Sequence, residues 1–196
     1  MQPYRINARE FESVANITSQ IISQATAAGL EVTGLAGVKA VKTAEELNVA
    51  MRSTGDIVAW SAGTPVINAE LKPGTRVQMV VTKAQAQAYT GSQGKQVPIG
   101  GWATFDDVIT QTQARQQLAI TNDFKKDVSY VIEYEVVKPI GGNIGFVGHQ
   151  TNVHGGLQRG GGTQIQFDWS SIPNGASRSD YLRPIDAPKV IPQLLK

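Results

Sequence analysis

The sequence predicts an α+β fold in which N-terminal helices precede a mostly antiparallel β-sheet core. Two observations carry this prediction. Apolar residues recur at helical spacing over residues 7–29 and again over 43–55. From residue 56 onward, short β-branched or alternating runs separated by turn residues predominate. Two helices followed by five or six strands, with one helix among them and no internal repeat, are typical of an α+β domain.

Each N-terminal helix begins with a capping box, Asn7 with Glu10 in the first and Thr43 with Glu46 in the second. We interpret both as packing helices, so residues 1–55 form a helical N-terminal extension and residues 56–196 the main domain. Within the main domain, we expect strands at 56–60, 77–81, 100–105, 128–137, 144–147, 163–169 and 181–185, a helical turn and loop at 85–96, and a helix capped by Asp106 and ending near residue 121.

The composition excludes several classes of protein. Of 196 residues, 41% are hydrophobic and 17% charged, which suits a folded domain with a sizeable core. A net charge of +2 is too small to indicate nucleic-acid binding, and no apolar run is long enough to span a membrane. There is no cysteine, which excludes disulfides, thiolate zinc sites and cysteine nucleophiles. The N-terminus lacks an apolar signal-peptide core, so an exported protein would leave by another route or be part of a longer chain.

A glycine-rich run between Lys138 and Asp168 is the most unusual segment. It contains nine of the 20 glycines, a single charged residue, Arg159, and both histidines. Ordering glycine costs more entropy than ordering any other residue, so this density requires a reason. The run is either the rim of a site that approaches a ligand closely or a mobile surface loop.

His149 and His154 leave three hypotheses open. A zinc site needs three or four ligands, and even with Asp168 the spacing matches no metal motif, so we expect no metal. The histidine pair could cleave RNA by acid–base catalysis, with Lys138 or Arg159 stabilising the phosphate. Two solvated loop histidines are the simpler interpretation.

Two glutamates, Glu133 and Glu135, are spaced to lie on one face of a strand. Paired carboxylates can act as acid and base, but here the opposite face is apolar, which favours a solvated face for the glutamates. Gly160–Gln164 is followed by neither a helix pattern nor a Lys-Ser/Thr pair, so neither nucleotide-binding glycine motif applies. A polar, phosphate-bearing ligand with a ring would suit a further set of residues: Trp102, Thr104, Arg115, Gln150, Arg159 and Gln164.

Five segments occur in an order that resembles the C-terminal toxin domains of bacterial polymorphic toxins of the Rhs and contact-dependent-inhibition types. They are GGWATF (100–105), QARQQLAI (113–120), YEVVKPI (134–140), IGFVGHQ (144–150) and GGGTQIQF (160–167). The motif GGGTQ followed by a strand is similar to the tuberculosis necrotizing toxin group of NAD glycohydrolases, which is related to the ADP-ribosyltransferases. The resemblance covers residues 75–185.

The resemblance implies a split β-sheet core of the ADP-ribosyltransferase type, in which a pair of small, perpendicular sheets clasps NAD in a cleft. Gln164 would stand where ADP-ribosyltransferases carry a catalytic glutamate, and Thr104 would be the polar member of the strand that shapes the nicotinamide pocket. Arg76, with Arg115 and Arg159 as rivals, would bind the NAD phosphates. Trp102 would stack on a ring, and Gly161 and Gly162 would let the backbone pass close to NAD.

The implied activity is cleavage of the bond between nicotinamide and ribose, by hydrolysis or by ADP-ribosyl transfer. A glutamine cannot act as a base, which favours hydrolysis. The resemblance also implies an effector secreted without a conventional signal peptide, acting in the target-cell cytoplasm and paired with a cognate immunity protein. The alternatives are an RNA-cleaving toxin that uses His149 and His154, and a non-enzymatic structural or adaptor component.

Overall fold

The computed structural model describes residues 38–53, 58–151 and 156–194, together with Ser19 and Ser23. The helix predicted over residues 7–29 therefore lies outside the described residues, except that Ser19 and Ser23 are helical and exposed. No helix among the described residues is both long and apolar enough to cross a membrane.

The larger sheet has five strands in the order β1-β2-β6-β9-β4, and every neighbouring pair is antiparallel. Its strands are β1 (Val38–Thr43), β2 (Pro65–Leu71), β4 (Trp102–Ala103), β6 (Ile140–Phe146) and β9 (Thr163–Phe167). Strand β1 pairs with β2 at the edge of this sheet, and helix α2 (Ala44–Ser53) follows it directly. The division at residue 55 stays a prediction.

The smaller sheet is built around β5 (Tyr130–Val136), which was the clearest strand in the sequence. One edge of β5 pairs with β3 (Arg76–Val81). The other edge pairs with β10 (Leu182–Pro184) near the end of β5 and with β11 (Lys189–Val190) near its start. The C-terminal segment thus covers an edge that would otherwise be open.

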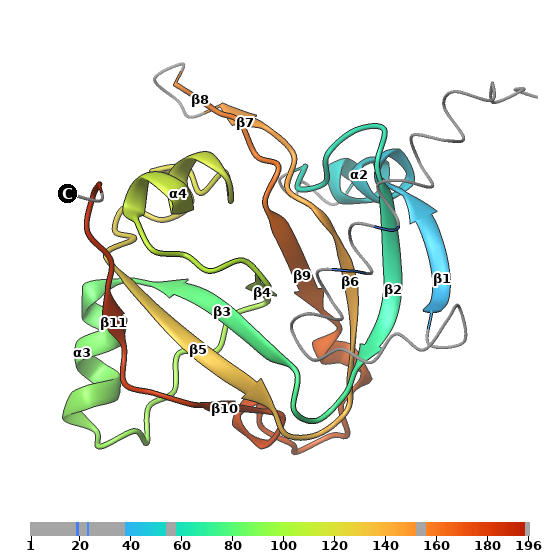
Figure 1. Ribbon diagram of the computed structural model, residues 1–196. Coiled ribbons are helices and arrows are strands. Elements are labelled where there is room, and N and C mark those ends of the chain that lie inside the picture. The colour runs from blue at the N-terminus through green and yellow to red at the C-terminus, as the bar shows by residue number, and fades with distance from the viewer. Residues whose placement is uncertain (1–18, 20–22, 24–37, 54–57, 152–155, 195–196) are drawn as a thin grey trace, which may run out of the picture.

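Strand β4 joins the two sheets, as Figure 1 shows. Its first residues pair with β9, and the next residue, Thr104, exchanges two backbone hydrogen bonds with Gln78 of β3, of 2.8 and 2.9 Å. The main hydrophobic core lies between the sheets and draws on both, with Ile67, Leu71, Ile144 and Ile165 from one sheet and Val77, Met79, Ile132 and Tyr134 from the other. The core is therefore divided between two mainly antiparallel sheets, as the resemblance implies.

Two smaller apolar clusters lie beside this core. One joins Val80 and Val131 to helix α4 (Gln111–Gln116), and the other joins Val66 and Trp60 to α2. In Figure 1, α4 and α2 lie on either side of β9. The short hairpin of β7 (Gln150–Thr151) and β8 (Leu157–Gln158) extends beyond β6 and β9.

The helices follow their capping signals with one exception. The capping box of α2 is formed, with Thr43 N donating to Glu46 Oε2 at 2.9 Å and Glu46 N donating to Thr43 Oγ1 at 3.2 Å. Helix α3 (Lys83–Gly91) lies where a helical turn was expected. The cap predicted at Asp106 is wrong: α4 is capped by Thr110, because the Asp106 carboxylate instead accepts from Thr163 N at 2.7 Å.

The strand predicted over residues 56–60 is also wrong, insofar as the structure describes it. Val58 and Ala59 are not in a strand, and Trp60 makes a single bridge to Val147. The Trp60 side chain is buried against Gly145, whose missing Cβ leaves room for the indole ring. The real strand is β2, which the sequence obscures because it begins with proline and contains Asn68 and Glu70 among its apolar residues. After β9, short 3-10 turns η2 (Trp169–Ser171) and η3 (Arg178–Asp180) lead to β10.

Candidate functional site

A cavity of about 310 Å³ lies where the two sheets meet, on the faces turned away from the main core. Strands β3, β4 and β9 supply its floor, α2 and the ends of β6 and β7 supply one side, and the chain after α4 supplies the other. The residues that line it are Met51, Ala59, Gln78, Met79, Val80, Trp102, Ala103, Thr104, Leu118, Ala119, Ile120, Thr121, Phe124, Lys125, Val147, Gln150, Thr163, Gln164 and Gln166.

Gln164 is built into the floor of this cavity. It is 8% exposed, and its backbone pairs with Gly145 of β6. Its side-chain Nε2 donates to Ala59 O at 2.7 Å. A carbonyl can only accept, so this contact assigns the nitrogen and directs the amide. No described residue donates to the Gln164 Oε1, so this oxygen can accept a hydrogen bond from a ligand.

Thr104 is buried beside Gln164, in a network that joins the GGWATF and GGGTQ segments. Its Oγ1 lies 3.0 Å from Thr163 Oγ1 and accepts from Asp106 N at 2.9 Å. Thr163 Oγ1 also accepts from Phe105 N, at 3.1 Å. These bonds fix the relative position of β4 and β9, so the two motifs form one rigid unit on the cavity floor.

Trp102 contributes the aromatic surface on this side of the cavity. Its ring is tilted against that of Trp60, with centroids 5.7 Å apart. Trp102 pairs in register with Gln166, whose Oε1 accepts from Asn143 Nδ2 at 3.2 Å; Asn143 in turn accepts from Asn68 at 3.0 Å. A row of amides across three strands therefore supports the polar part of the floor.

The glycine run packs against the protein's own backbone. Gly160 N donates to Gln116 O, and Gly162 N donates to Gln117 O, so the run crosses the end of α4. A Cβ at Gly160 would lie 2.4 Å from Val147 O, and one at Gly162 would lie 3.0 Å from Gln117 O. Gly161 is exposed, with open space around it. Neither Gly161 nor Gly162 lines the cavity, although both were expected to approach NAD.

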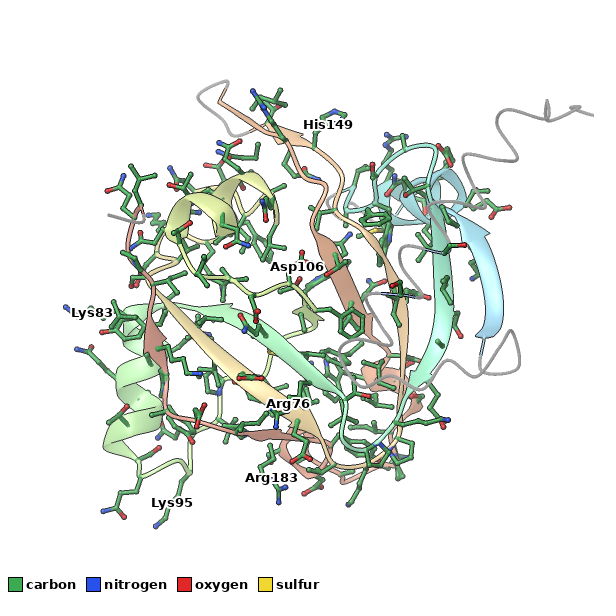
Figure 2. The ribbon with its side chains drawn as sticks, viewed as in Figure 1. Arg76, Lys83, Lys95, Asp106, His149 and Arg183 are labelled. Atoms are coloured by element: carbon green, nitrogen blue, oxygen red, sulfur yellow. The ribbon has the colours of Figure 1, made fainter. Side chains whose placement is uncertain are left out.

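The three candidate arginines also lie outside the cavity lining. Arg76 lies two residues before Gln78 on the same face of β3, and its guanidinium is 3.7 Å from the Glu133 carboxylate. Figure 2 shows Arg76 near Arg183. Arg159 is exposed in the segment between β8 and β9. Arg115 instead donates to three backbone carbonyls, those of Ile120, Lys125 and Lys126. Burial lowers the pKa of Arg115, while the charge on Asp127 opposes that shift.

Lys125 is the residue that sequence reasoning missed. Among the described residues that line the cavity, no other side chain is ionisable. Its Nζ donates to Val80 O. Burial lowers the pKa of Lys125, Asp127 opposes the shift, and the nearby charge of Arg115 adds to it. Lys125 belongs to no motif, and only the packing of residues 118–125 against β3 brings it to the cavity.

The remaining candidates do not converge on the cavity. His149 is exposed at the base of the β7–β8 hairpin, as Figure 2 shows, and His154 lies outside the described residues. Glu133 contacts Arg76 and Lys189, and Glu135 accepts from Arg183 at 2.8 Å, so both belong to a charged outer face. Within the described part of the chain, no three His, Asp or Glu residues lie close enough together to hold a metal ion.

No protein-family profile matches this chain, and no curated protein does. Among solved structures, the chain is similar to Tne2, determined in complex with Tni2, with 36% identity and a TM-score of 0.55 over 68% of this chain and 98% of that one. It is also similar to Rhs1-CT, determined in complex with its cognate immunity protein RhsI1, with 18% identity and a TM-score of 0.39 over 65% of this chain and 82% of that one. The match to Tne2 spans nearly all of that protein, so the chain belongs to the family of Tne2, the tuberculosis necrotizing toxin group of polymorphic-toxin C-terminal domains.

Proposed function

We propose that this domain cleaves the bond between nicotinamide and ribose in NAD and transfers the ADP-ribosyl group to water. The observation that carries the proposal is the position of Gln164: it is the glutamine of GGGTQ, it lies in the floor of the cavity, and its Oε1 has no partner among the described residues. Family membership with Tne2 supports the same conclusion.

The proposed reaction needs little acid–base chemistry. Nicotinamide leaves with the electron pair of the C–N bond and becomes neutral, while the ribose carbon acquires oxocarbenium character. Water then adds to that carbon and releases a proton to solvent. The cavity suits this sequence, because none of its described lining residues carries a carboxylate that could act as a base. In this mechanism the Gln164 Oε1 accepts from a ribose hydroxyl and stabilises the developing cation by its dipole.

Trp102 and Thr104 would shape the nicotinamide end. The Trp102 ring offers a face for the leaving group, and the Thr104 hydroxyl holds β4 and β9 at their observed separation. Eleven of the 19 lining residues are Met, Ala, Val, Leu, Ile, Phe or Trp, an apolar surface that limits the water near the reacting carbon.

We further propose that a cognate immunity protein inhibits this domain by covering the cavity, and that the domain acts as a secreted effector inside a target cell. The support is that Tne2 was determined as a complex with Tni2. A mixture of the domain with its immunity protein should release no nicotinamide.

Gln164→Ala is the direct test of the activity. Purified wild-type protein should release nicotinamide and ADP-ribose from NAD in equal amounts, as followed by chromatography. We expect Gln164→Ala to lower kcat by about a hundred-fold, the usual loss when one preorganised transition-state contact is removed. Gln166→Ala is the matched variant, because Gln166 lies two residues along the same strand and its Oε1 already accepts a hydrogen bond from Asn143 Nδ2.

The control for folding is thermal unfolding of each variant, since Gln164→Ala also loses the bond to Ala59 O. A wild-type protein that releases no nicotinamide would refute the proposed function. A Gln164→Ala variant that is folded and as active as wild type would remove Gln164 from the mechanism.

A further inference from the structure

The cavity carries one positive charge and, among its described lining residues, no negative one. The charge is the Lys125 ammonium, which donates one hydrogen bond to Val80 O and can donate two more to a ligand. The nearby Asp127 carboxylate is engaged elsewhere, because it accepts from the backbone N–H groups of Lys83 and Ser129. An anion that enters the cavity would therefore find Lys125 available.

From this arrangement we propose that Lys125 binds the pyrophosphate of NAD and that Phe124, beside it, stacks on the adenine. This assignment rests on the proposed function. It sets the direction of the dinucleotide: the nicotinamide ribose lies at β9 and the ADP half lies toward the far end of β3.

The path between Gln164 and Lys125 can be followed through contacts. Gln164 adjoins Thr163, whose hydroxyl touches that of Thr104. Thr104 pairs with Gln78 of β3. Val80, whose carbonyl holds Lys125, is two residues further along β3, about 7 Å by the rise of a strand. Gln164 thus lies in the floor of the cavity and Lys125 in its side, a geometry suited to the ribose and the phosphate of one ligand.

The segment that carries Lys125 is held rigidly. The Arg115 guanidinium donates to the carbonyls of Ile120, Lys125 and Lys126 at 2.7–2.8 Å, which ties both ends of the segment to α4. Arg115 therefore positions the binding residue, and its own charge adds to the positive potential at this end of the cavity.

Phe124 completes the subsite. Its side chain is 57% exposed although it is large and apolar, and it lines the cavity next to Lys125. Phe124 N donates to Thr121 Oγ1 at 3.2 Å, which holds its backbone in place. An exposed ring that lines a cavity is well placed to stack on a nucleobase, as aromatic side chains do in single-stranded nucleic-acid complexes.

Three substrates separate the parts of this subsite: nicotinamide riboside has no phosphate, nicotinamide mononucleotide has one phosphate and no adenine, and NAD has both features. The key variant is Lys125→Gln, because glutamine keeps an N–H for Val80 O and removes the charge. Its matched control is Lys126→Gln, the exposed neighbour that does not line the cavity. Michaelis constants and kcat are measured for each substrate, and urea unfolding reports the fold.

Lys125→Gln should raise KM for NAD and for the mononucleotide by about ten- to a hundred-fold, the value of a charge-assisted hydrogen bond. It should leave kcat unchanged for all three substrates and KM unchanged for nicotinamide riboside. Lys125→Arg should recover most of the affinity for NAD. Phe124→Ala should raise KM for NAD alone.

The outcomes distinguish this assignment from the proposed function. Wild-type protein inactive on all three substrates overturns the proposed function and this assignment with it. Active wild type, with Lys125→Gln showing the same KM for NAD as wild type and Lys126→Gln, overturns the pyrophosphate assignment alone. A rise in KM of equal size for the riboside would show a merely structural effect and would also overturn it.

Discussion

Substituting Gly160 by alanine tests why the glycine run is so rich in glycine. Gly160 has φ +74°, and its added Cβ would lie 2.4 Å from Val147 O and 2.7 Å from Gly148 O. Both neighbours are backbone atoms, which cannot rotate away as a flexible side chain can. The strand end of β6 and the glycine run would have to separate.

The structure allows the cost to be estimated. A non-glycine residue in the left-handed region costs about 1–2 kcal/mol. Separating the segments also breaks the bonds from Gly161 N to Val147 O and from Val147 N to Gly162 O, both 2.8 Å long. Each contributes about 1 kcal/mol, so Gly160→Ala should lower the free energy of unfolding by about 3–4 kcal/mol. Domains typically have a free energy of unfolding of about 5–15 kcal/mol, so this loss is about a third of the total.

Urea unfolding at neutral pH, followed by tryptophan fluorescence, measures this loss. The control is Gly161→Ala: Gly161 has φ +93° but open space at its Cβ position, so it should lose only the conformational part, about 1–2 kcal/mol. If the two variants unfold at the same urea concentration, the close approach of the backbones does not explain the glycine at position 160.

Two further predictions concern Arg115 and Tyr134. Arg115→Lys should lower the urea midpoint and raise KM for NAD, because an ammonium cannot reach all three carbonyls that the guanidinium holds. The control is Arg178→Lys, at a residue that donates to Ile99 O and does not line the cavity; it should leave KM unchanged, and equal KM values in both variants would contradict the positioning role of Arg115. Burial, with a smaller contribution from Tyr89, raises the pKa of Tyr134 well above its ordinary value near 10, so the unfolded chain loses the phenol proton at a lower pH than the folded protein does. The free energy of unfolding is therefore unaffected below pH 10 and falls as the pH rises further, by up to about 1.4 kcal/mol per pH unit. Tyr134→Phe loses the hydrogen bond to Pro98 O, so at neutral pH its free energy of unfolding should be about 1 kcal/mol below that of wild type. Because the variant has no phenol to titrate, this difference should shrink above pH 10 in a series of urea unfolding curves, whereas a constant difference would refute the assignment.

Strands were predictable where packing and local preference agree. Residues 77–81 and 128–137 are rich in β-branched and aromatic residues, most of which are buried, and they became β3 and β5. Strand β2 was missed because its polar residues serve contacts made within the sheet, such as Asn68 with Asn143. A bond between residues 75 positions apart leaves no local signature.

The residues of the candidate site also divide into those that the sequence predicted and those that only the structure identified. Gln164, Thr104 and Trp102, singled out by their motifs, all line the cavity. The arginines do not, because charge alone does not indicate where a side chain points: Arg76 contacts Glu133, and Arg115 holds a loop. Lys125 could not be distinguished from Lys126 in the sequence, and one lines the cavity while the other is exposed.

By itself, the sequence determined the α+β class, the mainly antiparallel core, the toxin family and Gln164, the glutamine of GGGTQ. These follow from short-range periodicity and from one motif. Only the tertiary structure decided what the glycines do and where the positive charge lies. The glycines are required because β6, α4 and the run meet backbone to backbone, and Lys125 reaches the cavity because Arg115 and Val80 hold its segment there. Both depend on contacts between residues far apart in the chain, which no local pattern of residues records.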